Sequence, residues 1–315
     1  MLTSGGDAPG MNAAIRAVVR TGIYHGFKVF GIRKGFEGLI DGDMAEMNLR
    51  SVSDILNRGG TTLQTARSKE FRTEDGVKRG VAMANIFKMD AIIVIGGDGS
   101  FRGARDLVNH GVKVIGIPAT IDNDIGCSTY TIGYDTALNT VKDAIDKIKD
   151  TAYSHERCSL VEVMGNGAGY IALNCAIADG AEACILPEKV FDINEDIILP
   201  IIGCRNRGKK HYIIVLAEGV ANAMDISAQI NEITGISTTT TILGHLQRGG
   251  SPTTRDRVMA SLMGAKATEL LSKGVFNRIV AAKGDDIVDY DIVEAIAMKK
   301  TIDPSIIETS KILAL

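Results

Sequence analysis

Short apolar runs rich in Ile and Val alternate along the chain with longer segments in which apolar residues recur every three or four positions. The short runs predict strands at residues 28–32, 91–96, 112–118, 159–165, 183–187, 211–217, 238–244 and 278–282. The longer segments predict helices, the clearest at 11–26, 136–155 and 253–274. Continuous apolar strands separated by helices indicate an α/β fold with mainly parallel sheets covered on both faces.

Length and composition narrow the class of protein. A chain of 315 residues is long enough for two moderate domains, each with its own core. The net charge of -3 argues against a broad nucleic-acid surface, and no apolar run approaches the roughly 18 residues of a membrane span. We therefore expect neither nucleic acid nor a membrane as a partner.

The cysteines favour a reducing compartment. The chain has five, at Cys127, Cys158, Cys175, Cys184 and Cys204. Their odd number and the lack of a CxxC pair argue against a disulfide framework and against a zinc site. We expect a cytoplasmic protein.

Glycine and polar clusters follow the predicted strands. They read SGGDAPG, GGDGS, PATIDND, MGNGAG, AEG and GHLQRGG. In an open α/β sheet, ligands bind outside the carboxyl ends of the strands, which is where these clusters fall. Their recurrence predicts a ligand site.

Two of the clusters have the composition of phosphate-binding loops. In AIIVIGGDGSFRGARDL, Gly96, Gly97 and Gly99 let backbone amides approach a phosphate, and the following helix adds its positive end. Asp98 is a hard oxygen ligand, suited to the Mg²⁺ that accompanies nucleotide phosphates. The loop TSGGDAPGMNAAIR offers a second cradle, and neither loop has P-loop spacing. The alternative is a plain strand-to-helix turn in which Asp98 caps the helix.

The segment PATIDNDI places two carboxylates, Asp122 and Asp124, two residues apart. This pair suits phosphoryl transfer to an alcohol, in which one carboxylate accepts the hydroxyl proton and the other serves the metal or positions water. The alternative is an Asx-rich turn to which Asn123 contributes.

Several cations and one acid near the clusters are candidates for binding a phosphorylated sugar. Arginine offers a planar fork for phosphate, and His245 and Arg248 follow a predicted strand closely enough to reach one ligand. Arg67 and Arg157 are further anion-binding candidates, and Glu218 could bind sugar hydroxyls. The alternative for each cation is a solvated surface charge, and for Glu218 an exposed acid at a strand end.

The segment VEVMGNGAGYIA also suits a dinucleotide pyrophosphate, because a strand, GxGxG and a helix start follow one another. The acidic residue that would confirm this interpretation is at best Glu188, after the strand at 183–187. A nicotinamide enzyme therefore remains a rival hypothesis.

Long motifs resemble those of bacterial ATP-dependent 6-phosphofructokinases, in order and spacing over nearly the whole chain. They are LTSGGDAPGMNAAIRAVVR, TARSKEF, IGGDGS, TIDNDI, TIGYDTALNT, SHER, EVMG, AEG and LGHLQRGGSPTTRDR. The resemblance implies transfer of the γ-phosphoryl group of Mg-ATP to the 1-hydroxyl of fructose 6-phosphate, which gives fructose 1,6-bisphosphate and ADP in glycolysis.

The resemblance also implies an architecture. It is a homotetramer of subunits built from two similar three-layer α/β/α domains, with the active site in the cleft between them and partly completed by a neighbouring subunit. We expect an ATP-binding domain at 1–133 plus 247–296 and a sugar-phosphate-binding domain at 134–246 plus 297–315.

Individual roles follow from the same resemblance. Asp122 resembles the base that takes the hydroxyl proton, and Thr120, Asp124 and Arg67 join it in the catalytic group. The ATP contacts implied are Gly6, Arg67, Ser68, Gly97, Gly99 and Ser100, with Asp98 as the Mg²⁺ ligand. The contacts implied for the sugar phosphate are Thr120, Asp122, Arg157, Met164, Gly165, Asn166, Glu218, His245 and Arg248.

Two positions bear on the phosphoryl donor. Pyrophosphate-dependent relatives usually have a second aspartate at the position of Gly99 and a lysine at that of Ala119. A carboxylate at position 99 would repel the α-phosphate of a nucleotide, so Gly99 favours ATP.

Two positions depart from the family. Asn166 stands where the family has an arginine that resembles a transition-state stabiliser, and Thr239 where it has one that binds the 6-phosphate from the neighbouring subunit. Loss of a donor to developing charge costs on the order of 100- to 1,000-fold in rate. The alternatives are a kinase with weakened fructose 6-phosphate binding, a paralogue with another phosphosugar acceptor, or a non-catalytic nucleotide-binding subunit.

An effector site for ADP or phosphoenolpyruvate lies between subunits in the family. The matching positions are Arg16, Arg20, Glu182, Arg207, Lys209, Lys210 and His211. The alternative for the basic run CRNRGKKH is a solvated helix end. Leu49 and Lys149 stand where the family has two further arginines of this site, so we expect an effector response that is present but altered.

Overall fold

The computed structural model describes residues 1–314 and divides the chain into two compact units. The first unit comprises residues 1–136 and 248–300, and the second comprises residues 137–247 and 301 onward. The chain therefore passes between the units after residues 136, 247 and 300.

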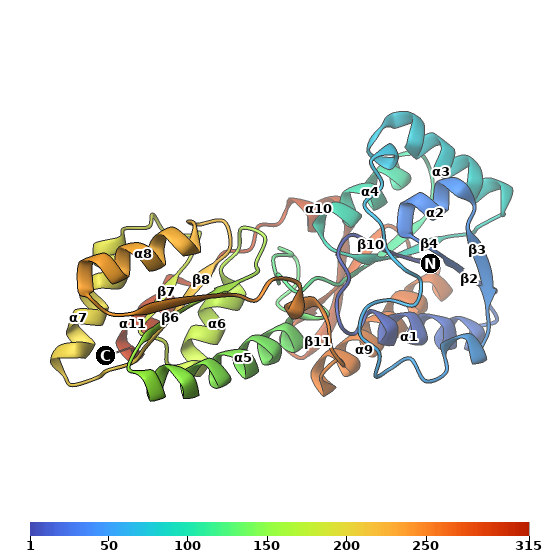
Figure 1. The fold of residues 1–315 in the computed structure, drawn as a ribbon. Helices are drawn as coiled ribbons and strands as arrows, with labels where there is room; N and C mark the ends of the chain where they lie inside the picture. The colour runs from blue at the N-terminus through green and yellow to red at the C-terminus, as the bar shows by residue number, and fades with distance from the viewer. Residues whose placement is uncertain (315) are drawn as a thin grey trace. The chain divides into compact units, whose positions relative to one another are not determined.

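The first unit is built on a seven-stranded sheet of order β11-β10-β5-β4-β1-β2-β3 (Figure 1). Its strands are β1 (Leu2–Ser4), β2 (Val29–Ile32), β3 (Met44–Met47), β4 (Ile92–Gly96), β5 (Val114–Pro118), β10 (Arg278–Lys283) and β11 (Asp286–Asp291). Its helices are α1 (Met11–Tyr24), α2 (Gly35–Asp41), α3 (Glu74–Ile86), α4 (Asp98–Asn109), α9 (Thr254–Ser272) and α10 (Ile292–Ala297), with short 3-10 helices at Arg50–Val52 and Glu70–Arg72. The five central strands are parallel, and the two edge strands are antiparallel to their neighbours.

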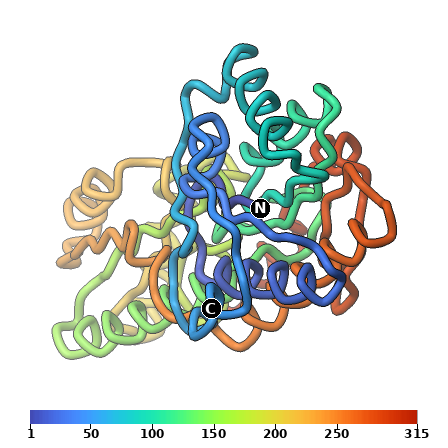
Figure 2. Tube along the Cα trace, turned by 90° about the vertical axis from the view of Figure 1, so that its right-hand side faces the viewer, coloured from blue at the N-terminus to red at the C-terminus, as the bar shows by residue number. Residues whose placement is uncertain are grey.

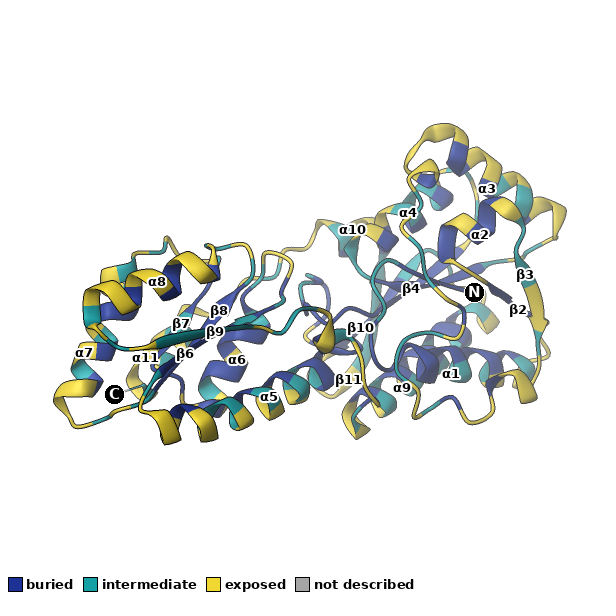
Figure 3. Cartoon of the chain, in the orientation of Figure 1, coloured by how far each residue is buried: buried dark blue, intermediate teal, exposed yellow. Residues whose placement is uncertain are grey.

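Helices cover both faces of this sheet. α1 and α9 pack together on one face, whereas α2, α3 and α4 lie on the other (Figures 1 and 2). On the second face, Phe36 and Phe71 stack with ring centroids 4.2 Å apart and join the core formed with Leu2, Val94 and Ile279. The central strands are buried on both sides, so they read as continuous apolar runs in the sequence (Figure 3).

The second unit has a four-stranded, wholly parallel sheet of order β7-β8-β6-β9. Its strands are β6 (Cys158–Val163), β7 (Ala183–Ile185), β8 (Tyr212–Ala217) and β9 (Thr238–Ile242). Its helices are α5 (Tyr134–His155, which begins in the first unit), α6 (Tyr170–Asp179), α7 (Leu199–Asn206), α8 (Ala223–Thr234) and α11 (Pro304–Leu313), with a π-helical turn at Asn194–Ile198 and a 3-10 turn at Gly244–Arg248. α7 and α8 pack on the strands in one core.

The α/β class and the mainly parallel sheets predicted from the sequence are confirmed, and each predicted strand and helix is present. The prediction missed β1, β3 and β11. β1 has only three residues, and β3 and β11 are edge strands in which polar residues interrupt the apolar pattern. Within residues 1–314, no helix is both long and apolar enough to cross a membrane.

Candidate active site

Three loops meet at the carboxyl end of the sheet in the first unit. Ser4 pairs with Gly96, and Gly96 pairs with Pro118, so β1, β4 and β5 end at the same level. The Ser100 hydroxyl donates to the carbonyl oxygen of Ser4 over 2.9 Å and ties two of the loops together. The fold therefore brings both glycine loops and the segment 119–124 to one place, as the sequence predicts.

The glycines of these loops serve two different purposes. A Cβ atom on Gly96 would lie 2.4 Å from Oγ of Ser100 and 2.5 Å from the carbonyl oxygen of Ser4, so this glycine is required for packing. Gly10 precedes α1 with a φ of 105°, in the left-handed region that favours glycine. By contrast, a Cβ atom on Gly99 would meet nothing within 4 Å. Gly99 therefore borders open space at the start of α4, where a phosphate could approach the backbone.

Asp98 is the first residue of α4 and is partly exposed. Its carboxylate lies 2.7 Å from the guanidinium of Arg102, one turn later in the helix. Sequence reasoning missed Arg102, although the four-residue spacing was a readable signal. Residues 1–314 contain no cluster of three or more metal-ligating side chains. A single carboxylate such as that of Asp98 fits Mg²⁺, which is commonly held by one or two carboxylates together with the phosphate oxygens of a substrate.

The segment after β5 folds into a turn that buries Asp122. The Thr120 hydroxyl donates to Oδ2 of Asp122 over 3.1 Å and also accepts from the Asp122 amide over 3.3 Å. Asp122 is 5% exposed, whereas Asp124 is only half-buried. Asn123, between the two carboxylates, has a φ of 52°. The turn thus separates the two carboxylates into different environments, which allows them different roles.

Arg67, Ser68 and Arg248 have different surroundings in the first unit. Arg67 is exposed, two residues after Thr65, whose hydroxyl donates to the carbonyl oxygen of Gly5 over 2.9 Å. The Ser68 hydroxyl accepts from the Phe71 amide over 3.2 Å, just before the 3-10 helix Glu70–Arg72.

Arg248 donates to the carbonyl oxygen of Asp7 over 3.3 Å, and a Cβ atom on Gly6 would lie 2.4 Å from its Nη1 atom. The sequence analysis predicted Arg248 as a ligand of the sugar phosphate. Its side chain packs against the first glycine loop, at Gly6 and Asp7.

A second set of predicted residues meets at the carboxyl end of the sheet in the second unit. Oε1 of Glu218 accepts from the Gly165 and Asn166 amides over 3.1 and 2.8 Å. The Met164 amide donates to Oε1 of Gln247 over 3.1 Å, and Gln247 is fully buried. Sequence reasoning missed Gln247, because nothing in GHLQRGG distinguishes a structural glutamine from a ligand. Burial, and then the charge of Glu218, raise the pKa of Glu162 on β6.

The structure does not bring every predicted sugar-phosphate residue to this place. Arg157 immediately precedes β6, so it lies at the amino end of the strand, whereas the Met164–Asn166 loop follows its carboxyl end. Thr239 pairs with Ser159 near the same amino end, and their hydroxyl oxygens are 3.4 Å apart. His245 is exposed in the 3-10 turn after β9. Within one chain, Arg157 and position 239 are therefore apart from Glu218 and His245.

The loop 165–169 does not favour the dinucleotide interpretation. Glu188 accepts from the Gly169 amide over 2.8 Å, and a Cβ atom on Gly169 would lie 2.6 Å from its other carboxylate oxygen. The acidic residue that should bind a ribose thus occupies a backbone amide of the loop that would have to bind the pyrophosphate.

The predicted effector residues of the second unit are largely engaged with one another or with neighbours. Lys209 pairs with Glu182, which is buried and also accepts from the Ile213 amide over 2.6 Å. Lys210 pairs with Glu156 over 2.8 Å, and His211 packs edge-on against Tyr153.

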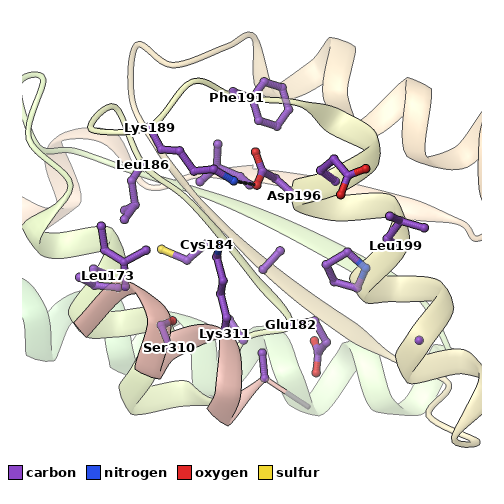
Figure 4. Close-up of a pocket in the computed structure, with 18 of the residues that line it drawn as sticks. Leu173, Glu182, Cys184, Leu186, Lys189, Phe191, Asp196, Leu199, Ser310 and Lys311 are labelled. Atoms are coloured by element: carbon purple, nitrogen blue, oxygen red, sulfur yellow. Dashed lines mark hydrogen bonds and ion pairs between the residues drawn. The ribbon is translucent and has the colours of Figure 1, made fainter. Parts of the chain in front are cut away.

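Glu182 and Arg207 line a cavity of about 380 Å³, which Cys184, Phe191 and α11 also border (Figure 4). Arg16 and Arg20 lie on α1 in the first unit.

Comparison with known proteins places the chain in a family. The model of the phosphofructokinase family matches residues 1–271. A protein of Alkaliphilus metalliredigens named ATP-dependent 6-phosphofructokinase is 54% identical over 315 residues, which cover all of this chain and 98% of that relative. A protein of Clostridium novyi with the same name is 54% identical over 314 residues, with the same coverage.

Solved structures agree with this assignment. The phosphofructokinase of Saccharomyces cerevisiae superposes with a TM-score of 0.88 and 33% identity over 99% of this chain, which spans 47% of the yeast chain. A pyrophosphate-dependent phosphofructokinase from Marinobacter aquaeolei shares the fold, with a TM-score of 0.83 and 20% identity over 96% of this chain and 84% of that chain. The chain belongs to the phosphofructokinase family.

Proposed function

We infer that this chain transfers the γ-phosphoryl group of ATP to the 1-hydroxyl of fructose 6-phosphate and produces fructose 1,6-bisphosphate and ADP, a step of glycolysis. The observation that carries this conclusion is the 54% identity, over the full length of the chain, to relatives named ATP-dependent 6-phosphofructokinase. A change of acceptor and a non-catalytic role are not favoured, because these relatives share the activity in their names and the chain keeps Asp122.

The first unit supplies the nucleotide site in this proposal. The backbone at Gly6, Gly97 and Gly99, with Ser100, Arg67 and Ser68, binds the phosphates of ATP, and Asp98 holds Mg²⁺. Mg²⁺ held there would supply positive charge close to the phosphate oxygens. Gly99 supports ATP as the donor, because it leaves open space where a carboxylate would repel the α-phosphate.

Asp122 acts as the general base in this proposal and takes the proton of the acceptor hydroxyl. Its burial and the Thr120 hydrogen bond support the role, because both fix the carboxylate in one orientation. Asp124 follows it in the same turn, and Arg67 stabilises charge on the transferred group.

The Met164–Asn166 loop, Glu218 and His245 bind the sugar phosphate in this proposal. Arg157 and position 239 lie at the amino ends of their strands, away from this loop. We therefore assign Arg157 to the site of a neighbouring subunit in a homotetramer. Size-exclusion chromatography with light scattering tests the assembly, and a monomer with full activity would contradict it.

An effector response that is present but altered is also part of the proposal. Lys209 is already paired with Glu182, so an anionic effector such as ADP or phosphoenolpyruvate would have to compete with a carboxylate. Initial rates with and without each compound test this expectation, and rate curves that neither compound changes would contradict it.

A coupled assay of the purified chain tests the activity itself. Aldolase and its coupling enzymes report fructose 1,6-bisphosphate directly, and we expect turnover with fructose 6-phosphate to exceed that with other sugar phosphates. Tight ATP binding without product from any acceptor would contradict the proposal. We expect the reaction to take place in the cytoplasm, a location that the five free thiols support.

A further inference from the structure

A single buried hydroxyl contacts the loop that carries Asp122 on both sides of that residue. Oγ1 of Thr131 donates to the carbonyl oxygen of Thr120 over 2.7 Å and lies 3.3 Å from Oδ1 of Asn123. Thr131 is 0% exposed. The hydroxyl therefore holds the loop two residues before Asp122 and one residue after it.

Asn123 is the part of the loop that most needs such support. Its φ of 52° lies in the left-handed region, which a residue with a Cβ atom adopts at some cost. Both ends of its side chain are bound, because Oδ1 is near the Thr131 hydroxyl and Nδ2 donates to the carbonyl oxygen of Thr129 over 3.5 Å. The surroundings thus select one conformation of the loop.

Thr131 is itself held by elements outside the loop. Its neighbour Ile132 forms an isolated parallel β-bridge with Ala119. The Ile132 amide donates to the carbonyl oxygen of Pro118 over 3.1 Å, at the end of β5. The Gly133 amide donates to Oδ1 of Asp256 over 2.7 Å, and Asp256 is fully buried at the start of α9. The position of the hydroxyl is therefore set by β5 and α9.

We propose that Thr131 is a positioning residue for phosphoryl transfer, whose hydroxyl fixes the loop 120–123 so that the Asp122 carboxylate meets the acceptor hydroxyl. This inference rests on the proposed role of Asp122 as the base. A displacement of about 1 Å in a catalytic group can cost on the order of 100-fold in rate, so one hydrogen bond can matter.

Thr131→Val tests the proposal, because valine keeps the shape and removes the hydroxyl. We expect kcat to fall by about 10- to 100-fold with an unchanged KM for ATP. Thr131→Ser keeps the hydroxyl and should retain kcat within a few-fold. Thr268→Val is the matched control, because the equally buried Thr268 hydroxyl donates to the carbonyl oxygen of Gly264 within α9. If Thr131→Val does not fold, Asn123→Gly removes the contact between Thr131 and position 123, since glycine tolerates this φ. We expect kcat to fall in this variant as well.

A double-mutant cycle with Asp122→Asn separates positioning from a general loss of structure. We expect Thr131→Val to have no further effect on the residual rate of Asp122→Asn, because no base then remains to be positioned. An equal loss in both backgrounds, or a loss no larger than that of Thr268→Val, would overturn the positioning role and leave the proposed function standing. If Asp122→Asn alone retains full kcat, the role of Asp122 is wrong, and this inference fails with it.

Discussion

The guanidinium of Arg102 lies 2.7 Å from the carboxylate of Asp98, the candidate Mg²⁺ ligand. Because this pair occupies the carboxylate that we propose as the Mg²⁺ ligand, we expect Arg102→Gln to lower the Mg²⁺ concentration for half-maximal activity. The shift should be less than about fivefold, since such exposed pairs are weak. Rates measured against Mg²⁺ at fixed ATP check this, with Arg105→Gln as the control on the same helix. A higher Mg²⁺ requirement in Arg102→Gln would contradict the prediction.

Asn166→Arg should raise kcat by about 10-fold or more, because it introduces a cationic donor at the position where the sequence resemblance implies an arginine. Asn166 is exposed and its φ is 53°, so we expect arginine to be accommodated at a stability cost of about 1 to 2 kcal/mol. Steady-state kinetics with fructose 6-phosphate check the gain. Asn166→Gln is the neutral control, and an equal gain from glutamine would show that charge is not the cause.

Lys209→Met should lower the free energy of unfolding by about 2 kcal/mol or more, because it leaves the buried Glu182 carboxylate without its cation. Lys210→Met is the matched control, since Lys210 and Glu156 are both exposed and should contribute little. Urea unfolding of the two variants checks the difference. Equal midpoints would contradict the prediction, because they would mean that the Lys209–Glu182 pair adds no more stability than the exposed pair.

Asp179 makes stability depend on pH. Burial, and then the charge of Asp146, raise the pKa of Asp179 to about 6, while Lys149 and Lys142 oppose the shift. The folded state therefore keeps a proton that the unfolded state releases near its ordinary pKa of 3.8, and this stabilisation is lost as pH rises through about 6.

Asp179→Asn should consequently raise the free energy of unfolding above pH 6 by about 1 to 2 kcal/mol, after allowance for solvent screening. At pH 4 the variant should gain nothing. Urea unfolding at both pH values checks this, and an equal effect at both would contradict it.

The central strands could be predicted because a strand buried on both faces appears in the sequence as a continuous apolar run. β4 and β5 are wholly buried and read as apolar runs. β3 is exposed in the middle and carries no such signal. β11 could have been found from its neighbour, because the two residues Gly284 and Asp285 connect it to β10 as a hairpin.

Candidate site residues could be predicted from the sequence only where a reactive side chain lies close after a predicted strand. Asp98 comes two residues after β4 and Asp122 four residues after β5, so the strand ends indicated both as candidates. Thr131 lies nine residues after Asp122, and its contact with Thr120 depends on the path of the intervening turn. Arg157 has the charge expected of a phosphate ligand, but it lies at the amino end of β6, whereas the Met164–Asn166 loop follows the carboxyl end. Residue type therefore indicated the chemistry, and the fold decided which residues meet.

The most direct test of the account is the turnover number of Asp122→Asn, measured beside ATP affinity from equilibrium titration. Loss of the proton acceptor should lower kcat by about 10²- to 10⁴-fold and leave ATP affinity unchanged. A variant that turns over within a few-fold of the wild type would contradict the claim that Asp122 is the base.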